Sequence, residues 1–172
     1  MHIRFDGRVV LVTGAAQGIG RAIAAGFRAG GARVHLADLD AEGVRAAAEE
    51  LGATAHVADL SGADAARACV AAVLGEEGRL DALALAAGGV RGQTGRPIEE
   101  VSEDDWRVLF QANVDGAFFL AQAAAPAMKA ARQGRIVTIS SGAGLRPSLT
   151  GIQAYSAAKH ALVGLTKQLS WE

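Results

Sequence analysis

Tyr155 and Lys159 are four residues apart, a spacing that places two side chains on one face of a helix. A phenol ordinarily has a pKa near ~10, which is too high for efficient proton transfer at neutral pH. A cation held beside a phenol favours the phenolate and lowers that pKa. The two residues could therefore form an acid/base unit. Taken alone, a tyrosine and a lysine at this spacing are more often a simple surface pair.

A glycine-rich segment near the N-terminus predicts a phosphate-binding turn. Thr13 to Gly20 reads Thr-Gly-Ala-Ala-Gln-Gly-Ile-Gly and follows a short apolar run. Gly14 would allow a tight turn, Gly18 a close approach of a nucleotide to the backbone, and Gly20 close packing of the next helix. Backbone N–H groups at the start of a helix suit a pyrophosphate. The alternative is an ordinary connection between a strand and a helix.

Asp38 follows the second apolar run, eighteen residues after Gly20. In a doubly wound sheet the adenosine ribose lies at the end of this strand. A carboxylate there accepts hydrogen bonds from the ribose hydroxyls and repels a 2′-phosphate, so the sequence favours NAD over NADP. Alternatively, Asp38 caps the following turn together with Asp40.

The order of apolar and amphipathic segments predicts an α/β fold. Short apolar runs alternate with segments of helical periodicity, which indicates a doubly wound, Rossmann-like parallel sheet in the order 3-2-1-4-5. We expect one domain over residues 1–172, with a kink or division at Pro126. The predicted strands are 9–12, 33–38, 54–58, 80–87 and 135–140. The predicted helices are 19–30, 40–51, 61–75, 102–131 and 154–171.

Composition excludes several classes of protein. Apolar residues make up 51% of the 172 residues and charged residues 20%, a balance typical of a globular chain. The formal net charge of −1 does not indicate a nucleic-acid or membrane surface. Cys69 is the single cysteine, which excludes an intrachain disulfide and fits a reducing compartment. We expect a cytoplasmic protein with no metal, no membrane and no nucleic acid as partners.

With these motifs in order, the chain resembles the short-chain dehydrogenase/reductase family in its compact single-domain branch. The resemblance covers essentially every residue and is carried by the glycine-rich segment, the Tyr155–Lys159 segment and three intervening positions. Those positions are Asp59-Leu60, Asn113 and Ser140-Ser141.

The resemblance implies a set of roles for these residues. Tyr155 would exchange a proton with the substrate oxygen, and Lys159 would lower the pKa of the phenol and bind the nicotinamide ribose. Ser141 would orient the carbonyl or alcohol, with Ser140 as the competing choice. Asn113 would hold a water molecule of a proton relay. The implied cofactor-binding residues are Thr13, Gly14, Gln17, Gly18, Ile19, Gly20, Asp38, Asp59, Leu60, Ala86, Ala87, Gly88, Tyr155 and Lys159.

Two departures from the family pattern stand out. The family usually has Asn-Asn-Ala-Gly after the fourth strand, where this chain has Leu85-Ala86-Ala87-Gly88. The family also continues beyond the last helix through further strands that complete the substrate pocket. We therefore expect that the chain is an incomplete part of a longer protein. By itself it should bind NAD weakly and turn over no substrate. In the order 3-2-1-4-5 the fifth strand would lie at an edge, with Ile136, Val137 and Ile139 exposed.

The leading functional hypothesis is an NAD-dependent oxidoreductase that interconverts a small alcohol and a ketone. A second hypothesis is a nucleotide-binding module without turnover, and a third is an epimerase or dehydratase, whose glycine spacing is usually shorter. The segment 89–96 contains two arginines that could edge the pocket and would suit an acidic or polyhydroxy substrate, although solvation of the surface is the preferred interpretation. The resemblance also implies a homodimer or homotetramer through segments 102–131 and 154–171. Their apolar residues are Phe118, Phe119, Leu120, Leu162, Leu165 and Leu169.

Overall fold

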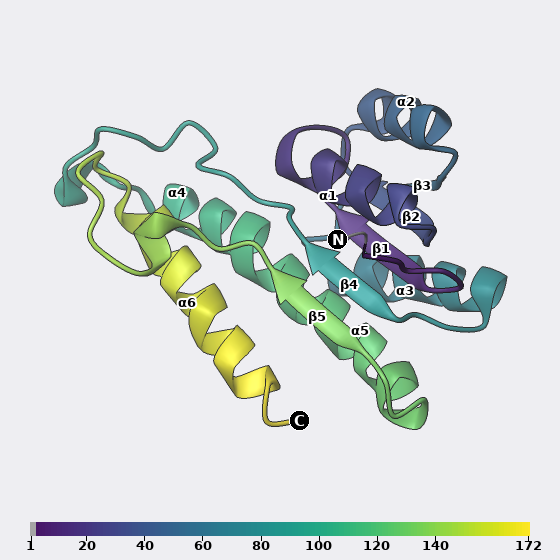
Figure 1. The fold of residues 1–172 in the computed structure, drawn as a ribbon. Coiled ribbons are helices and arrows are strands. Elements are labelled where there is room, and N and C mark those ends of the chain that lie inside the picture. The colour runs from purple at the N-terminus through teal and green to yellow at the C-terminus, as the bar shows by residue number, and fades with distance from the viewer. Residues whose placement is uncertain (1–2) are drawn as a thin grey trace.

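The computed structural model describes residues 3–172 and contains a five-stranded parallel sheet in the order β3-β2-β1-β4-β5 (Figure 1). The strand order predicted from the sequence is confirmed. The strands are β1 (Val9–Thr13), β2 (Arg33–Asp38), β3 (Thr54–Val57), β4 (Ala82–Leu85) and β5 (Arg135–Thr138). The helices are α1 (Gly18–Ala29), α2 (Ala41–Leu51), α3 (Ala63–Glu77), α4 (Glu103–Phe110), α5 (Gly116–Ala130) and α6 (Gln153–Leu169).

β1 lies in the middle of the sheet, and all five of its residues are buried. Alternate side chains of a strand face opposite sides, so its apolar run fills two cores. Val9 and Leu11 pack with residues of α3 and α5, whereas Val10 and Val12 pack with residues of α1 and α2. Helices therefore cover both faces of the sheet, as the sequence predicted.

The long helix predicted from Ser102 to Ala131 is irregular at a different place from the one expected. Ser102 caps α4 by accepting a hydrogen bond from Asp105 N at 3.1 Å, as part of a capping box. Between α4 and α5, residues Gln111–Asp115 form a π-helical segment. Pro126 lies inside α5, which continues to Ala130, so the prediction of a division at Pro126 is wrong. A proline removes one backbone donor but has a φ compatible with the helix, and buried packing on α3 holds α5 together.

Other element boundaries shift by a few residues. The predicted strands 80–87 and 135–140 shorten to β4 and β5, and the helix expected from Ser61 begins at Ala63. Ser61 is not a helix cap, because its backbone N–H and its hydroxyl both donate to Asp59 Oδ1. Asp40 does cap α2, since its Oδ1 accepts from Gly43 N at 3.1 Å.

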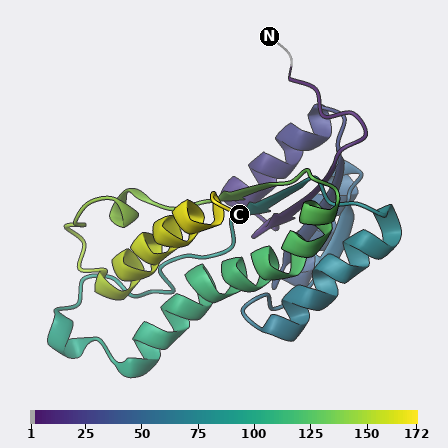
Figure 2. The same ribbon diagram turned by 90° about the horizontal axis from the view of Figure 1, so that it is seen from below.

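β5 pairs with β4 and lies at the edge of the sheet. Helix α6 contacts β5 and packs beside α4 (Figures 1 and 2). Val137 is 53% exposed at this edge, as expected. Ile136 instead packs against the core, and Ile139 is partly buried. Within residues 3–172, no helix combines the length and apolar character that crossing a bilayer requires.

Candidate nucleotide and catalytic site

A cavity of about 840 Å³ opens at the carboxyl ends of β1, β2, β3 and β4. This edge of a doubly wound sheet is where ligands bind, because the chain leaves neighbouring strands in opposite directions there. Of the predicted cofactor residues, all but Tyr155 and Lys159 line it. They are Thr13, Gly14, Gln17, Gly18, Ile19, Gly20, Asp38, Asp59, Leu60, Ala86, Ala87 and Gly88.

Close backbone packing explains two of the three glycines in the turn. Gly14 has a φ of +64°, and a Cβ there would lie 2.7 Å from the backbone of Ala87. A Cβ on Gly20 would lie 2.1 Å from the carbonyl oxygen of Gly14. The same Cβ would lie 3.0 Å from the carbonyl oxygen of Thr13, the last residue of β1, so Gly20 allows α1 to pack closely on both the strand end and the turn, as the sequence predicted.

Gly18 and the start of α1 face the cavity. Gly18 has a φ of +57°, and no atom lies within 4 Å of a Cβ built there. The residue that caps α1, Gln17, makes no side-chain hydrogen bond to the helix, and the first turn contains no acidic residue. The N–H groups of this turn thus have no side-chain acceptor from the cap. Together with the helix dipole, they provide a site that suits a phosphate group.

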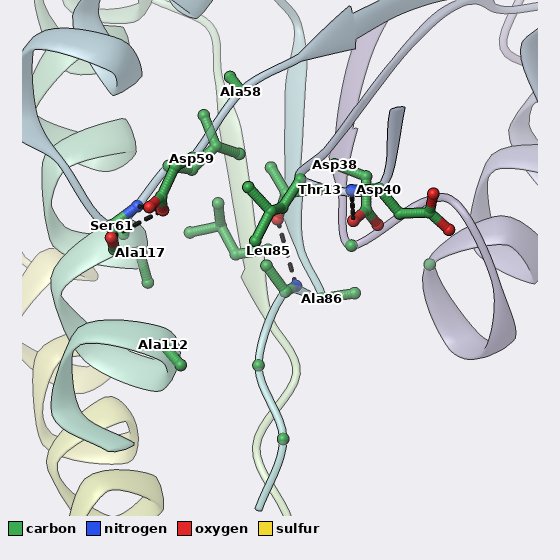
Figure 3. Close-up of a pocket in the computed structure, with 18 of the residues that line it drawn as sticks. Thr13, Asp38, Asp40, Ala58, Asp59, Ser61, Leu85, Ala86, Ala112 and Ala117 are labelled. Carbon is green, nitrogen blue, oxygen red and sulfur yellow. Dashed lines mark hydrogen bonds between the residues drawn. The ribbon is translucent and has the colours of Figure 1, made fainter. Parts of the chain in front are cut away.

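Asp38 ties the glycine-rich turn to β2. Its Oδ2 accepts from Ala16 N at 3.0 Å, and its Oδ1 accepts from Asp40 N at 3.1 Å. Figure 3 shows Asp38 and Asp40 on one side of Thr13, and Asp59 and Ser61 on the other. Asp38 therefore caps the turn, as the alternative interpretation expected, and it also lines the cavity. A contact between Asp38 and a ribose stays a prediction.

The backbone that follows β4 lines the cavity, and it is held by hydrogen bonds other than those that the usual asparagines of the family would make. Thr13 Oγ1 accepts from Ala87 N at 3.3 Å. Two residues further on, Gly89 N donates to Asn113 Oδ1 and Gly89 O accepts from Asn113 Nδ2, both at 3.0 Å. A threonine and a distant asparagine thus position the backbone that follows β4.

Asn113 is 2% exposed and belongs to the π-helical segment. Besides its two bonds to Gly89, its Nδ2 donates to Leu109 O at 2.9 Å. Segments of this type widen a helix and occur often at functional sites. The side-chain amide of Asn113 thus positions Gly89, and its role in a proton relay stays a prediction.

Lys159 is 4% exposed, and its ammonium group donates to Ile139 O at 2.9 Å. The same Nζ lies 5.6 Å from the centroid of the Tyr155 ring, within the range of a cation–π interaction. Burial lowers the pKa of Lys159. The structure therefore brings the tyrosine and the lysine together on α6, as their spacing predicted.

Gly88 connects this pair with the cavity. It lines the cavity, and a Cβ on Gly88 would lie 2.5 Å from Asn113 Oδ1 and 3.4 Å from Lys159 Nζ. The φ of Gly88 is +144°, a conformation that side chains rarely allow. Asn113, Ser141, Tyr155 and Lys159 do not themselves line the cavity, so Gly88 and its neighbour Gly89 connect the two groups of residues.

The two serines after β5 have different partners. Ser141 Oγ accepts from Ala143 N at 3.2 Å, at the start of the short 3₁₀ turn Gly142–Gly144. Ser140 Oγ donates to Lys159 O at 3.1 Å and thus joins the strand end to α6. Ser140 is committed to the helix backbone, which leaves Ser141 as the serine at the turn.

Several lining residues were not predicted from the sequence. Arg91, in the loop whose arginines were ambiguous, lines the cavity, whereas Arg96 pairs with Asp105 at 2.9 Å. Gly116 faces Leu60 so closely that a Cβ would lie 2.9 Å from its carbonyl oxygen. The glycine pair at 88–89 was the only signal for the contact with Asn113. The other unpredicted lining residues are Leu39, Asp40, Ala58, Ser61, Leu85, Gly89, Val108, Gln111, Ala112, Ala117 and Leu120.

A glycine cradle at a helix start and an acid at the next strand end define a doubly wound nucleotide-binding domain. The family model described as short chain dehydrogenase matches residues 8–172, and the chain belongs to this family. It is 41% identical to D-threitol dehydrogenase of Mycolicibacterium smegmatis and 40% identical to sorbitol dehydrogenase of Cereibacter sphaeroides, over 98% and 96% of this chain. It covers 65% and 64% of those two proteins, which is less than two thirds of their length.

A solved structure of a relative matches the whole architecture. A 7α-hydroxysteroid dehydrogenase, described in complex with NADH and 7-oxo glycochenodeoxycholic acid, superimposes with a TM-score of 0.91 at 29% sequence identity. The match covers 99% of this chain and 67% of that one. The doubly wound fold is therefore shared with a relative that binds a nicotinamide cofactor.

Proposed function

We propose that the chain is part of an NAD(H)-dependent oxidoreductase that interconverts a small-molecule alcohol and a ketone. The observation that carries this proposal is the position of Gly88, which lines the cavity and approaches both Asn113 and Lys159. One end of a cofactor bound in the cavity would therefore lie beside Gly88, next to Asn113 and Lys159. When bound, the nicotinamide supplies or accepts a hydride.

The residues around the cavity fit a dinucleotide. The N–H groups at the start of α1 would hold the pyrophosphate, because no acidic side chain competes in the first turn. Asp38 retains lone pairs for the ribose hydroxyls beyond its two backbone bonds. A 2′-phosphate would meet the negative charge of Asp38, which favours NAD over NADP.

The proposed catalytic roles follow from the groups around α6. Tyr155 exchanges a proton with the substrate oxygen, since its ring lies beside the ammonium of Lys159. Lys159 is held in place by Ile139 O and supplies the positive charge. Ser141 orients the substrate oxygen, and Asn113 keeps Gly88 and Gly89 in position. Dehydrogenases of threitol and sorbitol among the relatives support an alcohol as substrate.

A nucleotide-binding module without turnover remains the second candidate. One observation favours it: the four catalytic candidates lie outside the lining of the cavity. Binding of NADH and turnover of alcohols separate the two functions.

The test compares the unmodified protein with the Tyr155→Phe variant. Titration with NADH, followed by its fluorescence, should give dissociation constants within about twofold of each other. The rate at which the unmodified protein oxidises a panel of alcohols should fall at least about 100-fold in the variant, because Phe cannot transfer the proton. Binding of NADH without turnover in the unmodified protein would support the module instead. Unchanged turnover in Y155F would reject the mechanism.

We also propose a homodimer or homotetramer built on the α4–α5 and α6 segments. Of the apolar residues expected there, Leu120 and Leu162 belong to the core, whereas Phe118 is 44% exposed. Trp106 and Val108 on α4 are also exposed, at 44% and 38%. Light scattering at micromolar concentration should give at least twice the mass of one chain.

A cytoplasmic location suits Cys69, whose burial raises the pKa of its thiol to about 11.

A further inference from the structure

A second group of ionisable side chains lies outside the lining of the cavity, where β2 and β3 meet the C-terminal end of α3. His35 comes from β2, His56 from β3, and Glu76 and Glu77 from the last turn of α3. His35 precedes Asp38 by three residues, which is about 10 Å along the strand. The proposed oxidoreductase activity does not use these residues.

The group is joined by a chain of contacts through a buried imidazole. His35 is 1% exposed, its Nδ1 lies 2.9 Å from His56 Nε2, and its Nε2 lies 3.3 Å from Glu77 Oε1. When the proton of His35 is on Nδ1, it can be donated to His56 Nε2, and the lone pair of His35 Nε2 faces the carboxylate of Glu77. In this tautomer a divalent cation between His35 Nε2 and Glu77 Oε1 would bind both atoms.

The separation of His35 and Glu77 fits a shared metal ion. Bonds of about 2.0–2.2 Å from a tetrahedral Zn²⁺ to nitrogen and oxygen place two ligand atoms about 3.4 Å apart. The observed 3.3 Å is close to this value, and it is longer than the usual ~2.9 Å of a direct N–H···O bond. One ligand atom from each of His35, Glu76 and Glu77 lies within 4.8 Å of the others.

The local charge also favours a cation. Glu76 and Glu77 lie at the C-terminal end of α3, where the helix dipole is negative, and the last turn of α3 contains no basic residue. Arg33 pairs with Glu77 Oε2 at 2.7 Å and offsets one of the two negative charges. Glu76 is exposed, and its contact is a long 3.4 Å hydrogen bond from Thr54 Oγ1. A second positive charge would therefore be stabilised here.

We propose that His35, Glu76 and Glu77 bind one divalent transition-metal ion of the zinc class, and that His56 positions His35. Imidazole and carboxylate ligands suit Zn²⁺, whereas Ca²⁺ and Mg²⁺ prefer oxygen ligands alone. Three protein ligands leave a fourth position for water. The hydrogen bond from Nδ1 of a metal-binding histidine to an acceptor is a common feature of such sites, and His56 supplies the acceptor.

The test is calorimetric titration of the purified full chain, carrying no histidine tag, with ZnCl₂. One equivalent should bind, and Co²⁺ at the same site should give visible absorption typical of tetrahedral coordination. Glu76→Gln should weaken binding by at least about tenfold, because it removes a ligand without disturbing a buried contact. The matched controls Glu99→Gln and His160→Gln change exposed residues on other elements and should leave the affinity within about twofold.

Glu77→Gln provides an independent variant, with circular dichroism to check its fold. It should weaken binding of Zn²⁺ at least as much as E76Q, and an excess of Mg²⁺ or Ca²⁺ should not displace Co²⁺ from the unmodified chain. Absence of binding at about a 100-fold molar excess of Zn²⁺ over the protein would overturn the proposal. Binding that E76Q and E77Q leave unchanged would overturn it as well.

Discussion

Two aspartates lie at opposite ends of the same sheet. Asp38 ends β2 at the cavity and accepts hydrogen bonds from two backbone N–H groups. Asp81 immediately precedes β4 at the amino ends of the strands and is 6% exposed. Asp81 accepts bonds from Val9 N at 2.9 Å, Arg8 Nη1 at 3.0 Å, Arg79 Nε at 2.8 Å and Gln133 Nε2 at 3.1 Å.

This difference teaches how the fold separates binding from stability. At the carboxyl ends, glycines and a partly accessible acid leave donors and acceptors facing a cavity. At the amino ends, the carboxylate of Asp81 is bonded to groups from several segments, which holds β1, β4 and the chain before β5 together. Changes at Asp81 should therefore alter stability alone, whereas changes around the cavity should alter nucleotide binding.

The largest expected effect is that of Asp81→Ala. Removing a buried carboxylate leaves the Val9 N–H and two arginines without their acceptor, which should lower the free energy of unfolding by about 3 kcal/mol. Urea denaturation measures this loss. The dissociation constant of NADH, measured where the variant is folded, should change by less than about twofold. A tenfold weaker NADH complex would show that the two ends are not separate.

Gly20→Ala should damage the cavity end. A Cβ 2.1 Å from Gly14 O cannot be accommodated without moving the turn, so we expect a loss of about 2 kcal/mol of stability and at least about tenfold weaker NADH binding. Gly26→Ala on the same helix is the matched control, because no atom lies within 4 Å of its Cβ. The control should stabilise the chain by about 0.5–1 kcal/mol. Equal behaviour of the two variants would contradict the packing role of Gly20.

Asp38→Asn tests the cofactor preference with the acceptor oxygen retained. Removing the charge removes the repulsion of a 2′-phosphate, so the ratio of NADH to NADPH affinity should fall at least about fivefold. Stability should change by less than about 1 kcal/mol, since the amide oxygen can still accept one of the two backbone bonds. Titration of both nucleotides by fluorescence measures the ratio. Tighter binding of NADPH by the unmodified chain would show that the interpretation of Asp38 is wrong.

The smallest effect concerns acid stability. Burial by itself would raise the pKa of Asp81, but the hydrogen bonds from Arg79 and Val9, with the charges of Arg79 and Arg8, lower it overall. The folded pKa lies below the unfolded value near ~3.9, so the carboxylate stabilises the fold above that pH and loses this effect as pH falls through the folded pKa. The difference in unfolding free energy between the unmodified chain and Asp81→Asn should be constant from about pH 7 to pH 5 and shrink below about pH 4. A difference that grows on acidification would contradict this sign.

Much of the fold and of the cavity could be predicted from the sequence because the signals are local. The apolar run at 9–12 needs burial on both faces, and only a central strand between two helical layers provides it. The glycines at 14, 18 and 20 and the acid at 38 are read from spacing that the strand-turn-helix geometry itself imposes. The Tyr155–Lys159 contact follows from one helical turn.

Contacts between distant segments were decided by the tertiary structure alone. The hydrogen bonds between Asn113 and Gly89 depend on the π-helical segment, which the local sequence did not predict. The meeting of His35 with Glu77 joins residues 42 positions apart, a distance along the chain that no motif spans. Asp81 likewise accepts hydrogen bonds from two distant segments, through Arg8 and Gln133, besides its neighbour Arg79. Local sequence fixes backbone conformation and the buried face of each element, but packing determines which side chains of different elements meet.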